Sequence, residues 1–173
     1  SQTASGSASI EFTSGIDSTY PIYRFEFINI HPSVDGSLFQ FNMSTDGGSN
    51  YNVTKTTTVF ATYHFENDGA TSLSYRTSDD LAQSTSPQIL NTDSGADNDQ
   101  SSSGSLLLFN PSSDTFVKHF LSDVHFSQVN DLAMRFFTAG YGNTTSSINA
   151  IKFWQASGNI DSGTIKLYGI KGD

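Results

Sequence analysis

The chain has 173 residues, of which 8 are basic and 17 acidic, and its net charge is −9. Such an acidic balance repels DNA and anionic membrane surfaces, and so argues against nucleic acid as a partner. The absence of cysteine excludes disulfide bonds, thiolate nucleophiles and cysteine-ligated zinc. No run of 18 apolar residues occurs, and membrane insertion is therefore not expected.

The composition favours a β-sheet protein. The apolar residues are largely aromatic, with 14 Phe and 7 Tyr, and charged residues make up only 14%. Aromatic and β-branched side chains pack well on pleated sheets, whereas Gly, Asn and Asp form turns. No window shows the apolar spacing of an amphipathic helix. A chain of this length fits one domain.

The first part of the chain predicts strands separated by turns. Residues 1–8 are small and polar, and we expect a flexible lead or the end of a linker, followed by one β-sandwich domain over residues 9–173. Alternating apolar residues predict four strands, at 9–13, 20–30, 37–43 and 56–65. Asp35-Gly36, between two alternating runs, predicts a hairpin.

The middle of the chain is polar. Between residues 66 and 104 only 73–75 and 88–90 are weak strand candidates. Residues 91–105 contain few apolar side chains and predict a long exposed loop, a feature that in compact domains is functional or disordered. Further strands are expected at 106–109, 116–121 and 133–138.

The C-terminal part, residues 148–170, predicts two strands joined by a turn-rich linker, and so a closing hairpin. Its first strand alternates, and places Lys152 and Trp154 on the face opposite Phe153. In total the chain contains eight to ten expected strands with evenly spaced turn signals. This pattern is typical of an all-β protein, and we predict an antiparallel β-sandwich of jelly-roll-like form.

Three acidic residues, Asp93, Asp97 and Asp99, cluster in the predicted long loop. Calcium binds alternating carboxylates, but the glycine and the distal glutamate of an EF-hand are missing, so a solvated polar loop is the simpler interpretation. The four histidines show no spacing typical of metal ligands. We therefore predict no metal and no cofactor.

The sequence offers little for catalysis. Only three glutamates occur, and glycosidases need a pair of carboxylates at a fixed separation. No Gly-x-Ser-x-Gly motif is present, and we predict no catalytic residue. Three aromatic residues, Trp154, Tyr141 and Tyr168, would stack on sugar rings if they are exposed, and the alternative is that they pack in the core or between subunits.

Several short motifs carry a resemblance: SIEFTSGIDSTY at 9–20, NIHP at 29–32, DGGS at 46–49, LFNPSS at 108–113, and SGNI followed by SGTIKLYG at 157–169. Together they resemble a family of tail-fibre-like and other structural proteins of tailed bacteriophages, especially phages of marine bacteria and cyanobacteria. The resemblance covers nearly the whole chain. It implies a non-catalytic virion protein, and it assigns no role to individual residues.

From this resemblance we expect a domain of a tail fibre or appendage that binds a glycan or protein of the host cell surface. We expect a homotrimer that contacts other virion proteins, is assembled in the host cytoplasm and is then carried on the virion. Weak sites repeated by symmetry gain avidity, and rigid sandwiches present binding loops at their ends. We place the receptor-binding loops at one end of the sandwich, with these residues: Asp46, Asn50, Asp93, Asp97, Asp99, Tyr141 and Asn143.

Two alternatives remain. One is a capsid decoration (cement) protein that binds the phage shell. The other, which the low glutamate content disfavours, is a depolymerase that degrades surface polysaccharide.

Overall fold

The computed structural model describes residues 1–172, and in this range it contains strands and no helix, hence none that could span a membrane. The strands are β1 (Gln2–Ser7), β2 (Ile10–Phe12), β3 (Ile22–Pro32), β4 (Phe39–Ser44), β5 (Lys55–Phe65), β6 (Thr71–Tyr75), β7 (Gln88–Ile89), β8 (Ser102–Phe109), β9 (Lys118–Gln128), β10 (Leu132–Gly142), β11 (Ala150–Gln155) and β12 (Ile160–Ile170).

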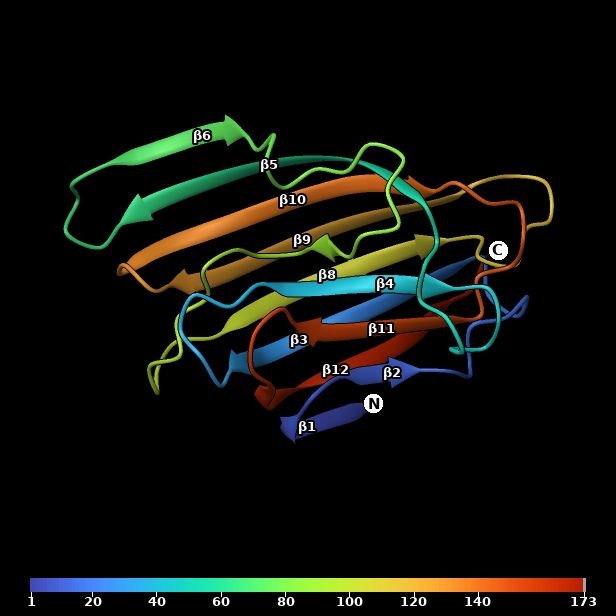
Figure 1. The fold of residues 1–173 in the computed structure, drawn as a ribbon, viewed down its shortest axis with the longest axis horizontal. Coiled ribbons are helices and arrows are strands. Elements are labelled where there is room, and N and C mark those ends of the chain that lie inside the picture. The colour runs from blue at the N-terminus through green and yellow to red at the C-terminus, as the bar shows by residue number, and fades with distance from the viewer. Residues whose placement is uncertain (173) are drawn as a thin grey trace.

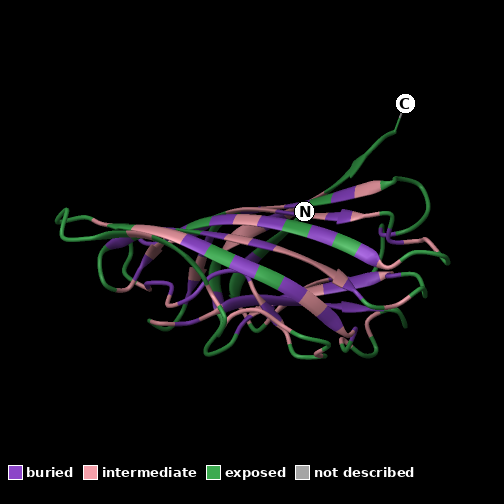
Figure 2. Cartoon of the chain, turned by 90° about the horizontal axis from the view of Figure 1, so that it is seen from above, coloured by how far each residue is buried: buried purple, intermediate pink, exposed green. Residues whose placement is uncertain are grey.

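The strands form two antiparallel sheets (Figure 1). One sheet has eight strands in the order β1-β12-β3-β8-β9-β10-β5-β6, and the other has four in the order β2-β11-β4-β7. Buried and exposed residues alternate along the long strands of the large sheet, as expected when one face packs on a second sheet and the other faces solvent (Figure 2). The prediction of an all-β antiparallel sandwich is confirmed.

The core between the sheets is built around aromatic rings. Phe153 of β11 is fully buried, and its ring lies 5.2–6.4 Å from five other phenylalanine rings. Two of these contacts, an edge-on one to Phe27 and a tilted one to Phe25, join the small sheet to the large sheet. The five neighbours are Phe12, Phe25, Phe27, Phe39 and Phe41.

Two predicted hairpins are wrong. The turn at Asp35-Gly36 exists, with Gly36 at φ +71°, but it leads the chain from β3 in the large sheet to β4 in the small sheet. In the same way β11 and β12 belong to different sheets. An alternating strand buries the same face whichever sheet it joins, so the pattern fixed the strands but not their partners.

The N-terminal residues also differ from expectation. Instead of a flexible lead, residues 2–7 form β1, which pairs antiparallel with β12 at the edge of the large sheet. Ala4 in its middle is buried. Small polar residues give no apolar alternation, and the neighbouring strand alone determines that this segment is ordered.

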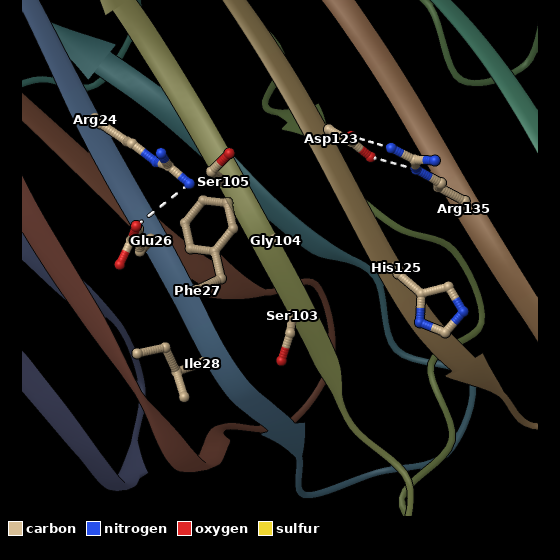
Figure 3. Close-up of a pocket in the computed structure, with 10 residues that line it drawn as sticks. All are labelled: Arg24, Glu26, Phe27, Ile28, Ser103, Gly104, Ser105, Asp123, His125 and Arg135. Atoms are coloured by element: carbon tan, nitrogen blue, oxygen red, sulfur yellow. Dashed lines mark hydrogen bonds and ion pairs between the residues drawn. The ribbon is translucent and has the colours of Figure 1, made fainter.

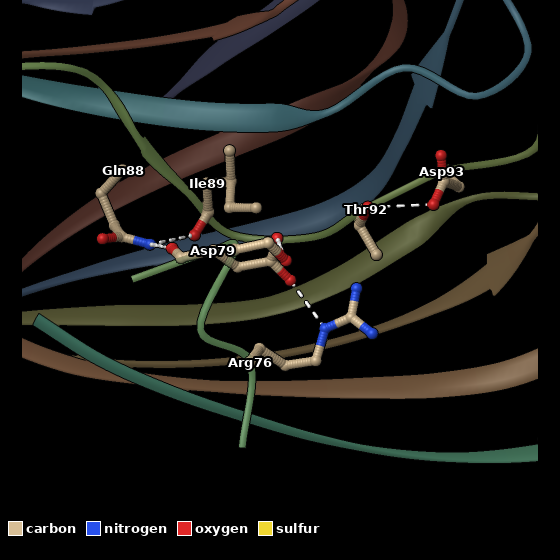
Figure 4. A network of polar contacts seen from close by, with 7 residues as sticks. Arg76, Asp79, Gln88, Ile89, Thr92 and Asp93 are labelled. Carbon is tan, nitrogen blue, oxygen red and sulfur yellow. Dashed lines mark hydrogen bonds and ion pairs between the residues drawn. The ribbon is translucent and has the colours of Figure 1, made fainter. Parts of the chain in front are cut away.

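The polar segment that follows β6 covers part of the inner face of the large sheet. Arg76 lies over the Phe136 ring, 5.8 Å from its centre. Figure 4 shows the Arg76 side chain beside Asp79, where its Nε donates to Asp79 Oδ2 at 2.7 Å. The Gln88 amide donates to the Asp79 carbonyl oxygen at 3.0 Å and accepts from the Thr57 hydroxyl at 2.6 Å. The hydrogen bond to Thr57 fastens the segment to β5, and the cation–π contact with Phe136 holds it against β10.

The prediction of a long exposed loop at 91–105 is wrong in large part. Residues 102–105 belong to β8, and Asn91 is fully buried. The Asn91 side chain accepts from the Phe39 backbone N–H at 2.7 Å and donates to the Ser102 hydroxyl at 2.8 Å. Polar side chains can be buried when their hydrogen bonds are satisfied inside the protein, and sequence pattern does not reveal these partners.

Candidate functional site

The residues predicted to bind a receptor do not form one surface. Asp46, Asn50, Tyr141 and Asn143 lie where β4 and β10 end, whereas Asp93, Asp97 and Asp99 lie at the opposite end, beside the end of β3 and the start of β8 (Figure 1). The expectation of a single loop cluster at one end is therefore wrong. The chain crosses the sandwich along strands of up to 11 residues, so loops close in sequence are separated by its full length.

Asp46 organises its own loop. Its Oδ1 accepts from the Ser44 hydroxyl at 2.7 Å and from the Asn50 backbone N–H at 2.9 Å, and its Oδ2 accepts from the Asn50 amide at 2.7 Å. These hydrogen bonds, above all those from Asn50 and Ser44, lower the pKa of Asp46 to about 2. Asp46 and Asn50 thus satisfy each other and hold the loop in shape.

We expect an NMR titration of the Asp46 carboxyl to give a pKa of about 2, and the Asn50→Ala variant to shift it back toward 3.8. Because the folded-state pKa lies below that of the unfolded chain, the stabilisation by Asp46 is present above pH 3.8 and is lost as the pH falls through about 2. The Asn143→Ala variant is the control and should leave the titration unchanged. A wild-type pKa near 3.8 would show that the loop is open.

The other predicted residues have structural contacts of their own. Tyr141 lies within β10, not in a loop, and its ring packs edge-on against His119 at 6.0 Å. The Asn143 amide donates to Gln83 at 2.8 Å. The Asp93 carbonyl oxygen accepts from the Val129 N–H at 3.0 Å, and Asp97 and Asp99 remain exposed.

A pocket of about 340 Å³ lies on the outer face of the four-stranded sheet, and we call it the aromatic pocket. Trp154 and Lys152 project into it from β11, because residues two apart on a strand share a face. Tyr51 reaches it from the loop between β4 and β5. The full lining is Ala8, Ser9, Asn42, Tyr51, Thr85, Pro87, Lys152 and Trp154.

The charges around the aromatic pocket are paired. Glu11 Oε1 lies 3.1 Å from Lys152 Nζ, and Glu11 Oε2 accepts from the Tyr51 hydroxyl at 3.0 Å. Burial raises the pKa of Glu11, but the hydrogen bonds from Lys152, Tyr51 and Ser9 outweigh it and the pKa lies below its ordinary value. Burial, and then the neighbouring Glu11 carboxylate, raise the pKa of Tyr51. At neutral pH the group therefore carries one positive and one negative charge.

Lys152 also connects the two rings of the aromatic pocket. Its ammonium lies 5.6 Å from the centre of the Tyr51 ring and 5.6 Å from that of Trp154, within the range of cation–π attraction. Both aromatic side chains are half-buried, so each keeps part of its surface open to solvent.

A buried lysine holds the floor of the aromatic pocket. Lys55 has no exposed surface, and its Nζ donates to Asn42 Oδ1 at 2.6 Å and to the Val53 carbonyl oxygen at 2.8 Å. The Asn42 amide in turn donates to the Thr85 carbonyl oxygen at 2.9 Å. These contacts fix the orientation of Asn42. Burial lowers the pKa of Lys55 to about 8.

A second depression, of about 470 Å³, lies on the outer face of the large sheet, and we call it the β8 trough (Figure 3). Its floor is made of small residues of β8, Ser103 to Ser105. A Cβ at Gly104 would collide with the Asp123 carbonyl oxygen, so β9 approaches too closely here for a side chain on β8.

The walls of the β8 trough are two ion pairs. Arg24 lies 3.3 Å from Glu26, and Arg135 Nε donates to Asp123 Oδ1 at 2.8 Å (Figure 3). The hydrogen bonds that Arg135 donates to Asp123, followed by the negative charge of Asp123, raise the pKa of Arg135. Since both arginines are already paired with carboxylates, the trough has no net charge from these four groups.

No group of three or more His, Asp or Glu side chains that could hold a metal ion occurs within residues 1–172. Comparisons with protein-family models, with curated proteins and with solved structures each found no match. The relation to phage virion proteins therefore stays a prediction.

Sequence reasoning found one member of the aromatic pocket, Trp154, as a candidate for sugar stacking. It missed Tyr51, Asn42 and Lys152. The alternation of β11 placed Lys152 beside Trp154 on one face, but no local signal brings Tyr51 and Asn42 to the same place. Pairing of β4 with β11 puts Asn42 directly opposite Lys152.

Proposed function

We propose that the chain is a non-catalytic recognition module that binds carbohydrate through the aromatic pocket. The observation that carries this proposal is a half-buried Trp154 beside Tyr51, in a pocket whose lining also includes four polar side chains. These are Ser9, Asn42, Thr85 and Lys152. Sugar rings present an apolar face that stacks on aromatic rings and hydroxyl groups that need hydrogen-bond partners.

The polar groups of the aromatic pocket suit hydroxyls. Lys152 supplies donors, and the Ser9 hydroxyl can donate or accept. Asn42 is 1% exposed and keeps one amide N–H beyond the one that it gives to Thr85. Asn42 is oriented in advance by Lys55 and Thr85, so binding costs little side-chain ordering there. Because Glu11 neutralises Lys152, a neutral sugar fits the pocket better than an acidic one.

The same geometry supports a binding role and not hydrolysis. Glycosidases place two carboxyl groups about 5–10 Å apart on either side of the scissile bond. None of the eight residues that line the aromatic pocket is acidic, and the adjacent Glu11 is held ionised by Lys152 and Tyr51. A carboxylate held in this way is a poor general acid.

The setting that we propose for this module is the surface of a tailed-phage virion, on a fibre or appendage that contacts the host cell. The resemblance of the sequence motifs supports this setting, and the carbohydrate coat of bacteria would supply the ligand. Several copies on one particle would add their weak affinities.

We expect the Trp154→Ala variant to bind neutral polysaccharide at least about tenfold more weakly than the wild type, because a stacking contact worth about 1.4 kcal/mol is lost. Affinity electrophoresis in gels that contain a mannan, a galactan or a glucan measures the change. The control is Tyr168→Ala, which removes an exposed aromatic residue from the large sheet.

Two results would contradict the proposal. One is the absence of retardation by every neutral polysaccharide, and the other is equal retardation of the wild type and Trp154→Ala. Binding of the fluorescently labelled chain to whole cells of marine bacteria and cyanobacteria tests the proposed host contact. Release of reducing sugar from the polysaccharides would instead favour the depolymerase.

A further inference from the structure

Strand β6 forms an open edge of the large sheet. It pairs with β5 on one side only, and it lies at the outermost position of the sheet (Figure 1). Four of its five residues are exposed. Leu73, in its centre, is 69% exposed, more than any other large hydrophobic residue of the part of the chain that the structure describes.

The hydrogen-bond pattern shows which backbone groups of β6 are free. The Arg76 N–H donates to the Val59 carbonyl oxygen at 2.9 Å, and the Phe65 N–H donates to the Ala70 carbonyl oxygen at 3.1 Å. In an antiparallel pair such bonds alternate, so residues 70, 72, 74 and 76 bond to β5. The N–H and C=O groups of Thr71, Leu73 and Tyr75 therefore point away from β5.

These outward groups have no partner within residues 1–172, either in the backbone or from a side chain. Long exposed edges are normally protected by a charge, a proline, a bulge or a very short strand. The other edges have such protection: β2 has three residues, β7 has two, and β1 is interrupted at Gly6, with φ +62°. The β6 sequence TSLSY has none.

The β6 sequence is also nearly symmetric about its centre. When two copies of TSLSY run antiparallel with Leu73 opposite Leu73, Ser72 lies opposite Ser74, and Thr71 lies opposite Tyr75. No charge opposes a like charge. Antiparallel pairing about a two-fold axis requires such self-complementarity, because each residue meets its own symmetry partner.

The side chains next to the edge would gain apolar contacts from this pairing. Leu73 and Tyr75 are two residues apart in β6, so their side chains lie on the same face of the sheet. Tyr75 pairs with Phe60 of β5, whose ring stacks on that of Phe137 at 4.7 Å. Tyr75 and Phe60 are 51% and 43% exposed. A second copy at the edge would cover part of this surface.

We propose that β6 pairs antiparallel with β6 of a second copy of this chain, and that the two large sheets join into one continuous sheet across a two-fold axis. The interface consists of the outward backbone groups of Thr71, Leu73 and Tyr75 and of the Leu73 side chains. The arrangement closes at two copies, and so differs from the homotrimer expected from the phage resemblance.

Sedimentation equilibrium over a series of protein concentrations tests the proposal. We expect the mass of the wild type to rise from 18.7 kDa toward about 37 kDa, twice that value. The Leu73→Pro variant should stay monomeric at concentrations where the wild type is mostly dimeric. Proline removes an N–H that points away from β5, and so spares the β5–β6 ladder.

The Leu73→Lys variant gives a second measure, because it keeps the backbone and places two like charges opposite each other. We expect it to weaken association at least about tenfold. Phe116→Lys is the matched control, since Phe116 is 68% exposed but lies just before β9. It should associate as the wild type does, and circular dichroism verifies that each variant is folded.

Hydrogen exchange of the backbone amides distinguishes pairing through β6 from non-specific association. In the dimer the N–H groups of Leu73 and Tyr75 should exchange more slowly as the protein concentration rises, and those of Asn67 should not. A wild type that stays monomeric up to millimolar concentration, or that forms trimers, would overturn the proposal. The proposal would also be overturned if Leu73→Pro dimerised as strongly as the wild type. The same holds if Phe116→Lys weakened association as much as Leu73→Lys does.

Discussion

Replacing Phe153 with alanine is expected to lower the free energy of unfolding by about 3–5 kcal/mol. The Phe153 ring has no exposed surface and contacts five other phenylalanine rings from both sheets, so its removal leaves a cavity at the centre of the sandwich. The surrounding rings are held by their own strands and can fill this space only in part. Denaturation by guanidinium chloride measures the loss.

The control for this experiment is Phe60→Ala. Phe60 is 43% exposed and stacks on a single ring, that of Phe137, so its removal should cost about 1 kcal/mol or less. Equal losses at the two positions would contradict the packing described here, because they would show that the rings around Phe153 close over the missing side chain.

The second large effect concerns the buried Lys55. Its pKa is about 8 in the folded protein and 10.5 in the unfolded chain, because burial disfavours the charged form. Below pH 8 both states are protonated. Between pH 8 and 10.5 the unfolded state binds a proton that the folded state lacks, and the contribution of Lys55 to stability therefore rises with pH.

We compare the wild type with Lys55→Met, which keeps the length of the side chain and removes the charge. Between pH 7 and pH 10.5 the free energy of unfolding of the wild type should increase relative to this variant by about 3 kcal/mol, since one pKa unit corresponds to about 1.4 kcal/mol. Urea denaturation at a series of pH values gives this difference. Other titrating groups are common to both proteins and cancel.

Lys171→Met serves as the control, because Lys171 is exposed. Its difference from the wild type should not vary with pH by a comparable amount. A pH-independent difference for Lys55→Met would contradict the proposed burial of this ammonium. The experiment also concerns the aromatic pocket, because Lys55 orients Asn42, and Lys55→Met should weaken polysaccharide binding as well as change stability.

The elements of the fold could largely be predicted from the sequence. Alternating apolar residues located the strands that became β2, β3, β4, β5 and β11, and the shortage of helix-forming patterns excluded a helical fold. The alternation has a physical cause, because a strand with one buried face must place an apolar side chain at every second position. It failed at β1, where Ala4 is the one buried side chain.

The sequence determined that this protein is an acidic, aromatic-rich, antiparallel β-sandwich, and that Trp154 lies on the face of its strand opposite the core residue Phe153. Only the tertiary structure decided which strands pair. That choice separated Asp46 from Asp97, buried Asn91, brought Tyr51 and Asn42 to Trp154, and left β6 without a second neighbour. The reason is that a strand buries the same face in either sheet, whereas its neighbours depend on hydrogen bonds between segments distant in the chain.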